Sequence, residues 1–399
     1  MKAKNRDELQ ALLREGLSWC MKCGACLSGC PVYRHRRTEG SSMRGKLALL
    51  QAIEAGRTLP PETVAEVLSH CTGCQTCRSL CPNGIDTVFL TLVARLILAQ
   101  DGTHDWTDRA GSSVRKYQLS SRLTLAAMPM LMHGIEGVRA GRLLRSLPRR
   151  VFHALRAEPD FAAFQTGSEI LFPGCALSQD PPRLQQLERV CAKVGLAVQL
   201  TPDLGCCGMP ELGIASAQRH EEQVRLLFDR LQKLQPKRIL VVCHRCLTGF
   251  RYLRSLYHWT AEEASLFDRI DDFTVRLASL NWTATKPLAG SVTVHDPCQL
   301  LRVPGAKAAT RSILARILSE PVVESSGDGT CCGFGGSFLF RHPTLAGDLR
   351  RERVEQLRKT GTQRMVTACT YCADSLELPL RRQGMETSLL IDLLDQALS

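Results

Sequence analysis

The second half of the chain alternates short β-branched stretches with long amphipathic stretches. The short stretches, rich in Ile, Val and Leu and bounded by polar residues, predict strands within 168–175, 238–243, 290–298 and 364–369. Between them, apolar positions recur at helical spacing, as in 217–234 and 344–360. Strands that alternate with helices indicate small parallel sheets, so the predicted fold class for this half is α/β.

Each predicted strand leads into a cysteine. These are Cys175, Cys243, Cys298 and Cys369. In parallel α/β sheets, ligands bind beyond the carboxyl ends of the strands, where the N-termini of the following helices favour an anionic group. The pattern therefore predicts binding sites built from cysteines at these strand ends.

The cysteines of this half form an internal repeat. Each copy has one cysteine, then an adjacent pair followed by glycine, then Cys-x2-Cys. The first copy is Cys175, Cys206, Cys207, Cys243 and Cys246; the second is Cys298, Cys331, Cys332, Cys369 and Cys372. Corresponding cysteines lie 123 to 126 residues apart, a regularity that core packing does not explain. Adjacent thiolates point apart, which suits two irons of one cluster, and Gly208 and Gly333 permit a close backbone approach.

Composition narrows the class of protein. The chain has 399 residues, 44% hydrophobic and 23% charged, as expected of a soluble globular protein with two or three domains. Its 19 cysteines favour metal-bound thiolates in a reducing cytoplasm, because the charged N-terminal sequence lacks the apolar core of a signal peptide. No stretch of about 18 apolar residues predicts a membrane span.

The net charge of +12 is typical of proteins that meet an acidic partner or an anionic surface. Residues 139–156 carry six arginines and no acidic residue. The wider stretch 124–156 has two interpretations: it docks on an anionic membrane surface or an acidic partner protein, or it forms a solvated linker. We therefore expect a cytoplasmic protein, with peripheral association at the inner face of the cytoplasmic membrane as the alternative. Aromatic residues make up only 5% of the chain and no nucleic-acid motif is present, so no nucleic-acid partner is expected.

Two further cysteine motifs stand near the N-terminus. Each has the spacing C-x2-C-x2-C-x3-C-P, which is typical of ferredoxins with two [4Fe-4S] cubane clusters. The fourth cysteine of each motif precedes proline and ligates the other cluster in such proteins. We therefore expect an outer set of Cys20, Cys23, Cys26 and Cys81, and an inner set of Cys71, Cys74, Cys77 and Cys30. Zinc and disulfides fit this spacing less well.

The cysteine distribution predicts four regions. A mainly α-helical ferredoxin-like domain spans 1–100, and a helical basic connector without cysteines spans 101–165. Two cysteine-rich domains follow at 166–285 and 286–399, each with its own small parallel sheet.

The pattern Cys, Cys-Cys-Gly and Cys-x2-Cys, given twice, resembles the cysteine-rich (CCG) domains of heterodisulfide reductase and its relatives. In those domains five cysteines hold a non-cubane four-iron cluster. The resemblance implies one such cluster on each repeat, beside the two cubanes of the ferredoxin-like domain. Together the four sets account for 18 of the 19 cysteines.

The whole layout resembles the iron–sulfur subunits of glycolate oxidase and lactate dehydrogenase. The resemblance implies an electron-transfer subunit that receives electrons from an FAD-containing partner that oxidises a 2-hydroxy acid, and passes them to a quinone, a membrane cytochrome or another acceptor. No flavin or nicotinamide motif is present, so neither cofactor is expected in this chain. The alternatives are a heterodisulfide-reductase-like protein that reduces a disulfide at a non-cubane cluster, the corresponding iron–sulfur subunit of an anaerobic glycerol-3-phosphate dehydrogenase, and an assembly scaffold that binds little iron.

A few other residues near the cysteines have two interpretations. His295 and Asp296 either hydrogen-bond to a cluster or cap a strand end. His244 and Arg245 either donate to cluster sulfur or lie on the surface. Cys191, outside both repeats, is expected to be a buried core thiol.

Overall fold

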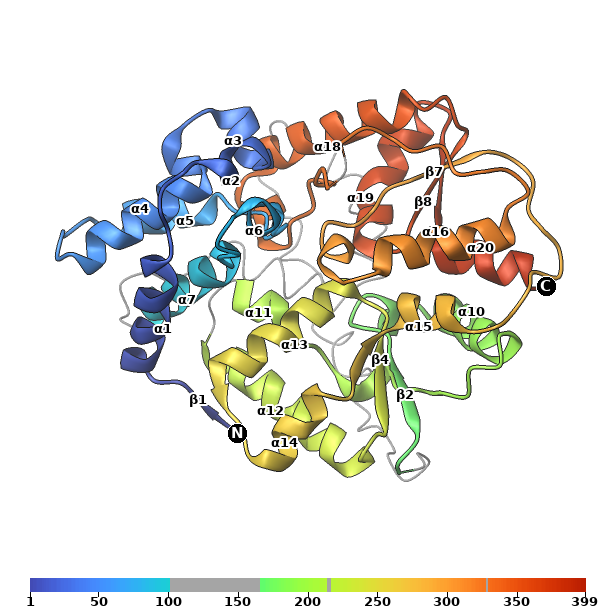
Figure 1. Cartoon of the computed structure of the whole chain (residues 1–399), viewed down its shortest axis with the longest axis horizontal. Coiled ribbons are helices and arrows are strands. Elements are labelled where there is room, and N and C mark those ends of the chain that lie inside the picture. The colour runs from blue at the N-terminus through green and yellow to red at the C-terminus, as the bar shows by residue number, and fades with distance from the viewer. Residues whose placement is uncertain (101–165, 214–216, 328) are drawn as a thin grey trace, which may run out of the picture.

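The computed structural model describes residues 1–100, 166–213, 217–327 and 329–399. The predicted connector 101–165, and with it the basic stretch 124–156, lies outside the described residues. Figure 1 shows a helical N-terminal part in blue, a first α/β part in green and yellow, and a second α/β part in orange and red. In the part of the chain that the structure describes, no helix is long and apolar enough to cross a bilayer.

The N-terminal part is built from short helices, apart from the two-residue strand β1 (Lys2–Ala3). The helices are α1 (Arg6–Ser18), α2 (Ala25–Ser28), α3 (Pro31–Arg36), α4 (Met43–Glu54), α5 (Pro61–Ser69), α6 (Thr76–Leu80) and α7 (Thr87–Gln100), with a 3₁₀ turn at Glu39–Ser41. Helix α1 begins at a capping box in which Asn5 and Glu8 satisfy each other's backbone N–H groups. Its buried leucines Leu9, Leu13 and Leu17 face one way, and the helix packs on α7.

The first α/β part contains a four-stranded parallel sheet in the order β3-β2-β4-β6. Its strands are β2 (Glu169–Phe172), β3 (Gln199–Leu200), β4 (Arg238–Val241) and β6 (Ile270–Asp272). The helices are α10 (Pro181–Lys193), α11 (Met209–Gly213), α12 (Ala217–Leu234), α13 (His244–Leu256), α14 (Ala261–Phe267) and α15 (Phe273–Ser279), with 3₁₀ turns at Leu177–Gln179 and Pro202–Leu204. The short strand β5 (Tyr257–His258) pairs with β1 and ties the N-terminus to this part.

The second α/β part repeats this topology. Strands β7 (Val292–Val294), β8 (Arg364–Thr367) and β9 (Glu386–Leu389) are parallel and ordered β7-β8-β9, and a bridge from Thr293 to Val323 adds the position that β3 holds in the first sheet. The helices are α16 (Ala306–Ile317), α17 (Ser337–Arg341), α18 (Pro343–Arg358), α19 (Thr370–Arg381) and α20 (Leu390–Ala397), with a 3₁₀ turn at Leu300–Arg302. The internal repeat of the sequence is therefore a repeat of the fold.

The predicted secondary structure and fold class are confirmed. All four predicted strands form, as β2, β4, β7 and β8, and the two predicted helical stretches become α12 and α18. The N-terminal part is helical and both C-terminal sheets are parallel, as the alternation of patterns predicted.

The two α/β parts pack through matched pairs of helices. Helix α10 of the first contacts α20 of the second, and α16 of the second contacts α15 of the first. Because α10 corresponds to α16 and α15 to α20, the two contacts are equivalent, as in an isologous interface with an approximate two-fold axis. One buried cluster spans both parts, with Leu171 and Leu187 from the first and Ile313 and Leu393 from the second.

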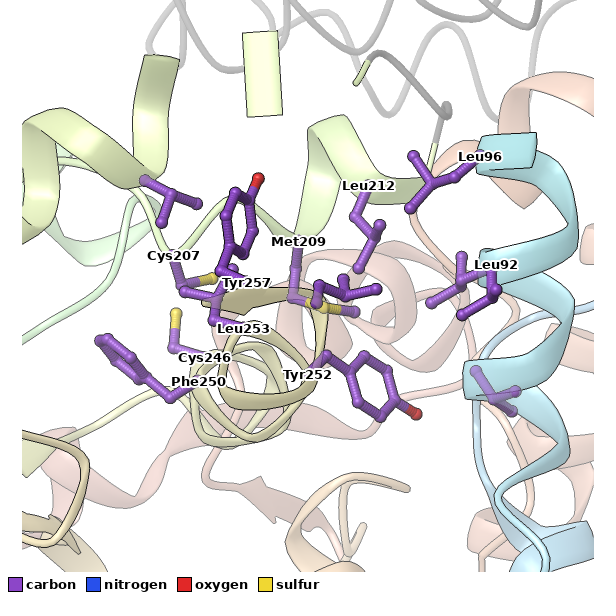
Figure 2. Packing of buried hydrophobic residues seen from close by; sticks show 14 of the residues in the cluster. Leu92, Leu96, Cys207, Met209, Leu212, Cys246, Phe250, Tyr252, Leu253 and Tyr257 are labelled. Carbon is purple, nitrogen blue, oxygen red and sulfur yellow. The ribbon is translucent and has the colours of Figure 1, made fainter. Parts of the chain in front are cut away.

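The N-terminal part packs on the first α/β part through α7. Figure 2 shows Leu92 and Leu96 of α7 facing Met209 and Leu212 of α11. All four side chains are buried in one cluster, which also contains Cys207. This packing holds the ferredoxin-like part against the first cysteine-rich part.

Candidate metal centres

The two ferredoxin motifs fold into loops of the same shape. The third and fifth positions of each motif have positive φ: 59° at Lys22 and 84° at Gly24 in the first, 73° at Gly73 and 59° at Gln75 in the second. A non-glycine residue in this region costs about 1–2 kcal/mol, and such strain concentrates at functional sites. In this shared conformation the first three cysteines of each motif lie near one another: Cys20 and Cys23 act on the pKa of Cys26, and Cys71, Cys74 and Cys77 line one cavity.

The outer set lies where the two motifs meet. Helix α2 of the first motif contacts α6 of the second, and the side-chain amide of Asn83 donates to the Trp19 carbonyl oxygen at 2.6 Å. These contacts bring the segment after Cys81 to the segment before Cys20. Burial raises the pKa of Cys26, and the nearby Cys20 and Cys23 raise it further. Cys23 is an exposed cysteine, so this set borders solvent.

The inner set is buried between the motifs and α7. Its members line one small cavity of about 20 Å³: Cys30, Cys71, Cys74 and Cys77. Burial raises the pKa of Cys30 to about 11 and that of Cys77 well above the usual value. The structure thus places Cys30 of the first motif with three cysteines of the second, which is the exchange expected from the spacing.

Lys46 of α4 lies beside the inner set and is fully buried. Its Nζ donates to the carbonyl oxygens of Ser41 at 2.8 Å, Ser42 at 3.3 Å and Gly40 at 3.4 Å. No carboxylate pairs with it among the described residues. Burial lowers the pKa of Lys46, whereas the thiolates of Cys71 and Cys30 raise it. Burying an ammonium without an anion is costly, so this position suits an anionic group held by the cysteines.

The five-cysteine sets sit at strand ends, as predicted. Cys243 follows β4 and is the N-cap of α13, while Cys369 follows β8 and is the N-cap of α19. Cys175 and Cys298 follow β2 and β7, several residues before the N-caps of α10 and α16, which are Asp180 and Gly305. The N-termini of α13 and α19 present positive partial charge to Cys243 and Cys369.

The two five-cysteine sets line one cavity of about 110 Å³ between the α/β parts. Nine of the ten repeat cysteines face it: Cys175, Cys207, Cys243, Cys246, Cys298, Cys331, Cys332, Cys369 and Cys372. The tenth, Cys206, lies next to Cys175 and Cys207. Tyr371, between two cysteines of the second set, places its hydroxyl 3.3 Å from Cys175 Sγ of the first. The approximate two-fold axis therefore brings the two sets face to face, which sequence spacing did not predict.

The same thiol is central in each set. Hydrogen bonds from Cys206 and Cys246 lower the pKa of Cys207 to about 5, and Figure 2 shows Cys207 and Cys246 side by side. Hydrogen bonds from Cys331 and Cys372 likewise hold the pKa of Cys332 well below its usual value, with His295 adding to the effect. A hydrogen bond from Cys246 also lowers the pKa of Cys243, to about 6.

The glycine after each pair has a steric role. Gly208 and Gly333 have φ of 77° and 80°. A Cβ on Gly333 would overlap the carbonyl oxygen of Ala346 in α18. The glycine therefore lets the Cys-Cys turn lie directly against the helix.

The inner set borders the second five-cysteine set. The charge of Cys74 acts on the pKa of both Cys298 and Cys331. The side-chain amide of Gln299, next to Cys298, donates to the Gly73 carbonyl oxygen at 2.5 Å. The described sets therefore follow one another in space: outer, inner, second repeat, first repeat.

The structure places differently the residues near the cysteines that had two interpretations in the sequence. Asp296 forms an ion pair with Arg311 of α16 at 2.7 Å. His244 is buried 3.2 Å from Asp272, so a surface position for it was wrong, whereas Arg245 lines the shared cavity. Cys191 is a buried thiol of the inter-repeat core, as expected.

Sequence reasoning missed two residues beside the cysteine sets. Lys46 stands four residues after Ser42, the N-cap of α4, and Tyr371 stands inside the second Cys-x2-Cys. Both were visible in the sequence, but only their burial or their contact with another set distinguishes them from ordinary surface residues.

The donor chemistry fits iron–sulfur clusters. Each set consists of cysteine sulfurs alone, the soft ligands that iron–sulfur clusters require. Clusters with four thiolate ligands are anionic, which matches the buried Lys46 and the helix N-termini.

Comparison with known proteins agrees with the geometry. Residues 16–85 match the family described as 4Fe-4S dicluster domain, and residues 170–251 and 292–377 match the family described as cysteine-rich domain. The chain is similar to one subunit of the fumarate reductase (CoM/CoB) of Methanothermobacter marburgensis, with 27% identity over 396 residues that cover 96% of this chain and 73% of the relative.

Two further relatives span most of the chain. The probable glycolate oxidase iron-sulfur subunit of Bacillus subtilis is 23% identical, covering 95% of this chain and 93% of its own. One subunit of the dihydromethanophenazine:CoB–CoM heterodisulfide reductase of Methanosarcina barkeri is 24% identical, covering 90% of this chain and 88% of its own. The predicted resemblance is confirmed: the chain belongs to the iron–sulfur electron-transfer proteins that join a 4Fe-4S dicluster domain to two cysteine-rich domains.

Proposed function

We propose that this chain is the electron-transfer subunit of a flavin-dependent oxidoreductase that acts on a 2-hydroxy acid of the glycolate or lactate type. An FAD-containing partner would remove two electrons from the substrate, and a quinone or another respiratory acceptor would receive them. The similarity to glycolate oxidase iron-sulfur subunits over nearly the whole chain supports this assignment. A shorter match to a lactate utilization protein from Macrococcus caseolyticus supports the substrate class.

The ligand assignment belongs to the same proposal. The outer and inner sets would each hold a [4Fe-4S] cubane, and each five-cysteine set would hold a non-cubane four-iron cluster. When bound, these clusters would supply one-electron redox chemistry, which the two-electron oxidation of a hydroxy acid does not provide. Iron analysis tests the count, because four such clusters require about sixteen irons per chain, whereas the cubanes alone require about eight.

The observation that carries the proposal is the spatial succession of the four sets. The exposed Cys23 belongs to the set at one end, and the inner set contacts the second repeat through Gln299 and Gly73. The second and first repeat sets then share one cavity. The chain thus holds its cysteines as a continuous path from the surface to its interior.

The partner would dock over the outer set. Five large apolar side chains are exposed in the described part of the chain, and three of them flank outer-set cysteines: Trp19, Met21 and Leu80. Trp19 is 59% and Met21 65% exposed. Exposed apolar side chains that gather in one place mark interaction sites, and aromatic residues dominate the energetics of such interfaces. The flavoprotein is the occupant we assign to this surface, because electrons enter where the path reaches solvent.

Copurification and kinetics test the assignment. Tagged chain should retain a flavin-containing protein, and the isolated chain should not oxidise glycolate or lactate. The double variant Trp19→Ala/Met21→Ala should weaken retention of the flavoprotein at least tenfold while leaving iron content unchanged. Leu226→Ala is the matched control, because Leu226 is 44% exposed and belongs to α12 of the first α/β part, outside both ferredoxin motifs in the sequence. Equal retention by both variants would contradict the docking surface, and a partner without flavin would contradict the function.

A second candidate function is reduction of a disulfide. The cavity shared by the two five-cysteine sets, with the Tyr371 hydroxyl close to Cys175, favours it, as does the similarity to the heterodisulfide reductases of two Methanosarcina species. In that case the isolated chain, given a chemical reductant, would turn over a disulfide and the rate would fall in Tyr371→Phe. An isolated chain that leaves disulfides intact excludes this candidate.

A further inference from the structure

His295, at the end of β7, has two ring nitrogens in different surroundings. Its Nδ1 accepts a hydrogen bond from Nε of Arg353 at 3.0 Å. Its Nε2 is buried and makes no hydrogen bond to a nitrogen or oxygen atom among the described residues. A ring nitrogen of His295 and the sulfurs of Cys332 and Cys372 lie within 4.8 Å of one another. Because Arg353 occupies Nδ1, Nε2 is the nitrogen left to interact with these sulfurs.

Arg353 fixes the proton on the imidazole. Its guanidinium also donates to the Ser326 carbonyl oxygen at 2.9 Å and to the Ser325 hydroxyl at 2.8 Å. The Arg353 side chain thus extends from α18 and is anchored to the loop before α17 by these two hydrogen bonds. Guanidinium groups only donate, so Nδ1 must be unprotonated and the neutral ring carries its proton on Nε2.

The same tautomer separates a hydrogen-bond donor from a metal ligand. A neutral histidine that binds a metal through Nε2 carries its proton on Nδ1 and donates it to an acceptor. Here that proton would point at the N–H of Arg353. His295 is therefore built to donate to sulfur and not to coordinate iron.

The first repeat lacks both members of this pair. At the 123-residue offset that relates Cys298 to Cys175, His295 corresponds to Phe172. At the 125-residue offset that relates Cys332 to Cys207, Arg353 corresponds to Phe228. Both phenylalanines are buried and apolar. The two repeats match in all five cysteines but differ in the donor beside them.

We propose that His295, oriented by Arg353, is a positioning residue that donates a hydrogen bond from Nε2 to Cys332 and so makes the two five-cysteine sets electronically unequal. Hydrogen bonds to cluster sulfur stabilise the reduced, more negative state and raise the reduction potential. The second repeat, which borders the inner ferredoxin set, thus holds its electron more tightly than it would with the apolar residue that the first repeat has at this position. The inference rests on the proposed occupation of the second set by an iron–sulfur cluster.

The test is a redox titration of the iron-replete full chain, followed by electron paramagnetic resonance. A Cys332→Ser variant identifies the signal of the second set. In His295→Phe, which copies the first repeat at this position, the midpoint of that signal falls below its wild-type value. His295→Gln keeps an N–H donor and restores part of the difference. His220→Gln removes a buried histidine of the first repeat and leaves the second-set midpoint unchanged.

Spectroscopy of histidine labelled with ¹⁵N gives a second readout that does not depend on the variants. A donor gives a weak nitrogen coupling and a proton signal that is lost in D₂O. A strong coupling, typical of a nitrogen bound to iron, would overturn the proposal, as would equal midpoints in wild type, His295→Phe and His295→Gln. A second set without iron would overturn the proposed function as well, and iron analysis would reveal that before any titration.

Discussion

Replacing Lys46 with methionine should lower the reduction potential of the inner ferredoxin set. Methionine keeps the length of the side chain and removes the ammonium. The ammonium now lies in the protein interior beside Cys30 and Cys71, where its charge stabilises added negative charge. Without it, reduction of a cluster held by these cysteines becomes less favourable.

The structure sets the size of the effect. The Ser41 carbonyl oxygen lies 2.8 Å from Lys46 Nζ and 4.0 Å from Cys30 Sγ, so the ammonium and this sulfur are within about 7 Å of each other. At an effective dielectric constant of about 20, unit charges about 7 Å apart interact by about 2 kcal/mol. For a one-electron couple this corresponds to about 100 mV, and water-like screening would reduce it to about 25 mV. We therefore expect a fall of about 25–100 mV.

Redox titration monitored by electron paramagnetic resonance measures this shift, with a Cys77→Ser variant to identify the inner-set signal. Arg44→Met is the matched control, because Arg44 lies on the same helix beside Cys26 of the outer set and is partly exposed. It should leave the inner-set midpoint in place. An unchanged or higher midpoint potential of the inner set in iron-replete Lys46→Met would refute the electrostatic reasoning.

Three further predictions concern stability and ligation. Gly333→Ala should lower the free energy of urea unfolding by about 2–4 kcal/mol and lower the iron content, because the added Cβ overlaps the backbone of α18. Gly361→Ala is the control: Gly361 has φ of 72° and open space around it, so the same measurement should show a loss of about 1–2 kcal/mol. Burial lowers the pKa of His220 to about 4, so the stability that this histidine contributes is present above about pH 6.5 and is lost as the pH falls toward 4. In His220→Gln, the difference in unfolding free energy between these two pH values should be smaller by about 3 kcal/mol. An unchanged difference would contradict the assignment. Cys207→Ser should disturb the first five-cysteine signal and spare the ferredoxin signals, while Cys191→Ser, in the core, should change no cluster signal.

Much of the fold could be predicted because local patterns decided it. The β-branched stretches before Cys243 and Cys369 predicted strands, and the amphipathic stretch 217–234 predicted the helix found there, since both depend on short-range periodicity. The repeat of five cysteines predicted the repeat of the fold for the same reason: equal spacing requires equal connections.

What the sequence could not reveal depends on contacts between distant segments. The shared cavity arises because α10 meets α20 and α16 meets α15, and no local pattern encodes that pairing. The buried Lys46 stands in the sequence MRGKLALLQ, which does not distinguish it from a lysine on the exposed face of a helix. Arg353 approaches His295 from 58 residues away, so the tautomer of His295 followed only from three-dimensional packing.

The core that spans the two α/β parts has a consequence for how the chain can be divided. Leu171 and Leu240 of the first sheet and Val294 and Val366 of the second belong to one continuous apolar cluster. A fragment that ends at residue 285 would expose half of that cluster to water, and such a fragment would cover it most simply by self-association across the same face. A duplicated gene that began as one such unit would thus have encoded a homodimer with two identical cysteine sets. Fusion of its two copies would have freed each set to change separately, as the exchange of Phe172 for His295 illustrates.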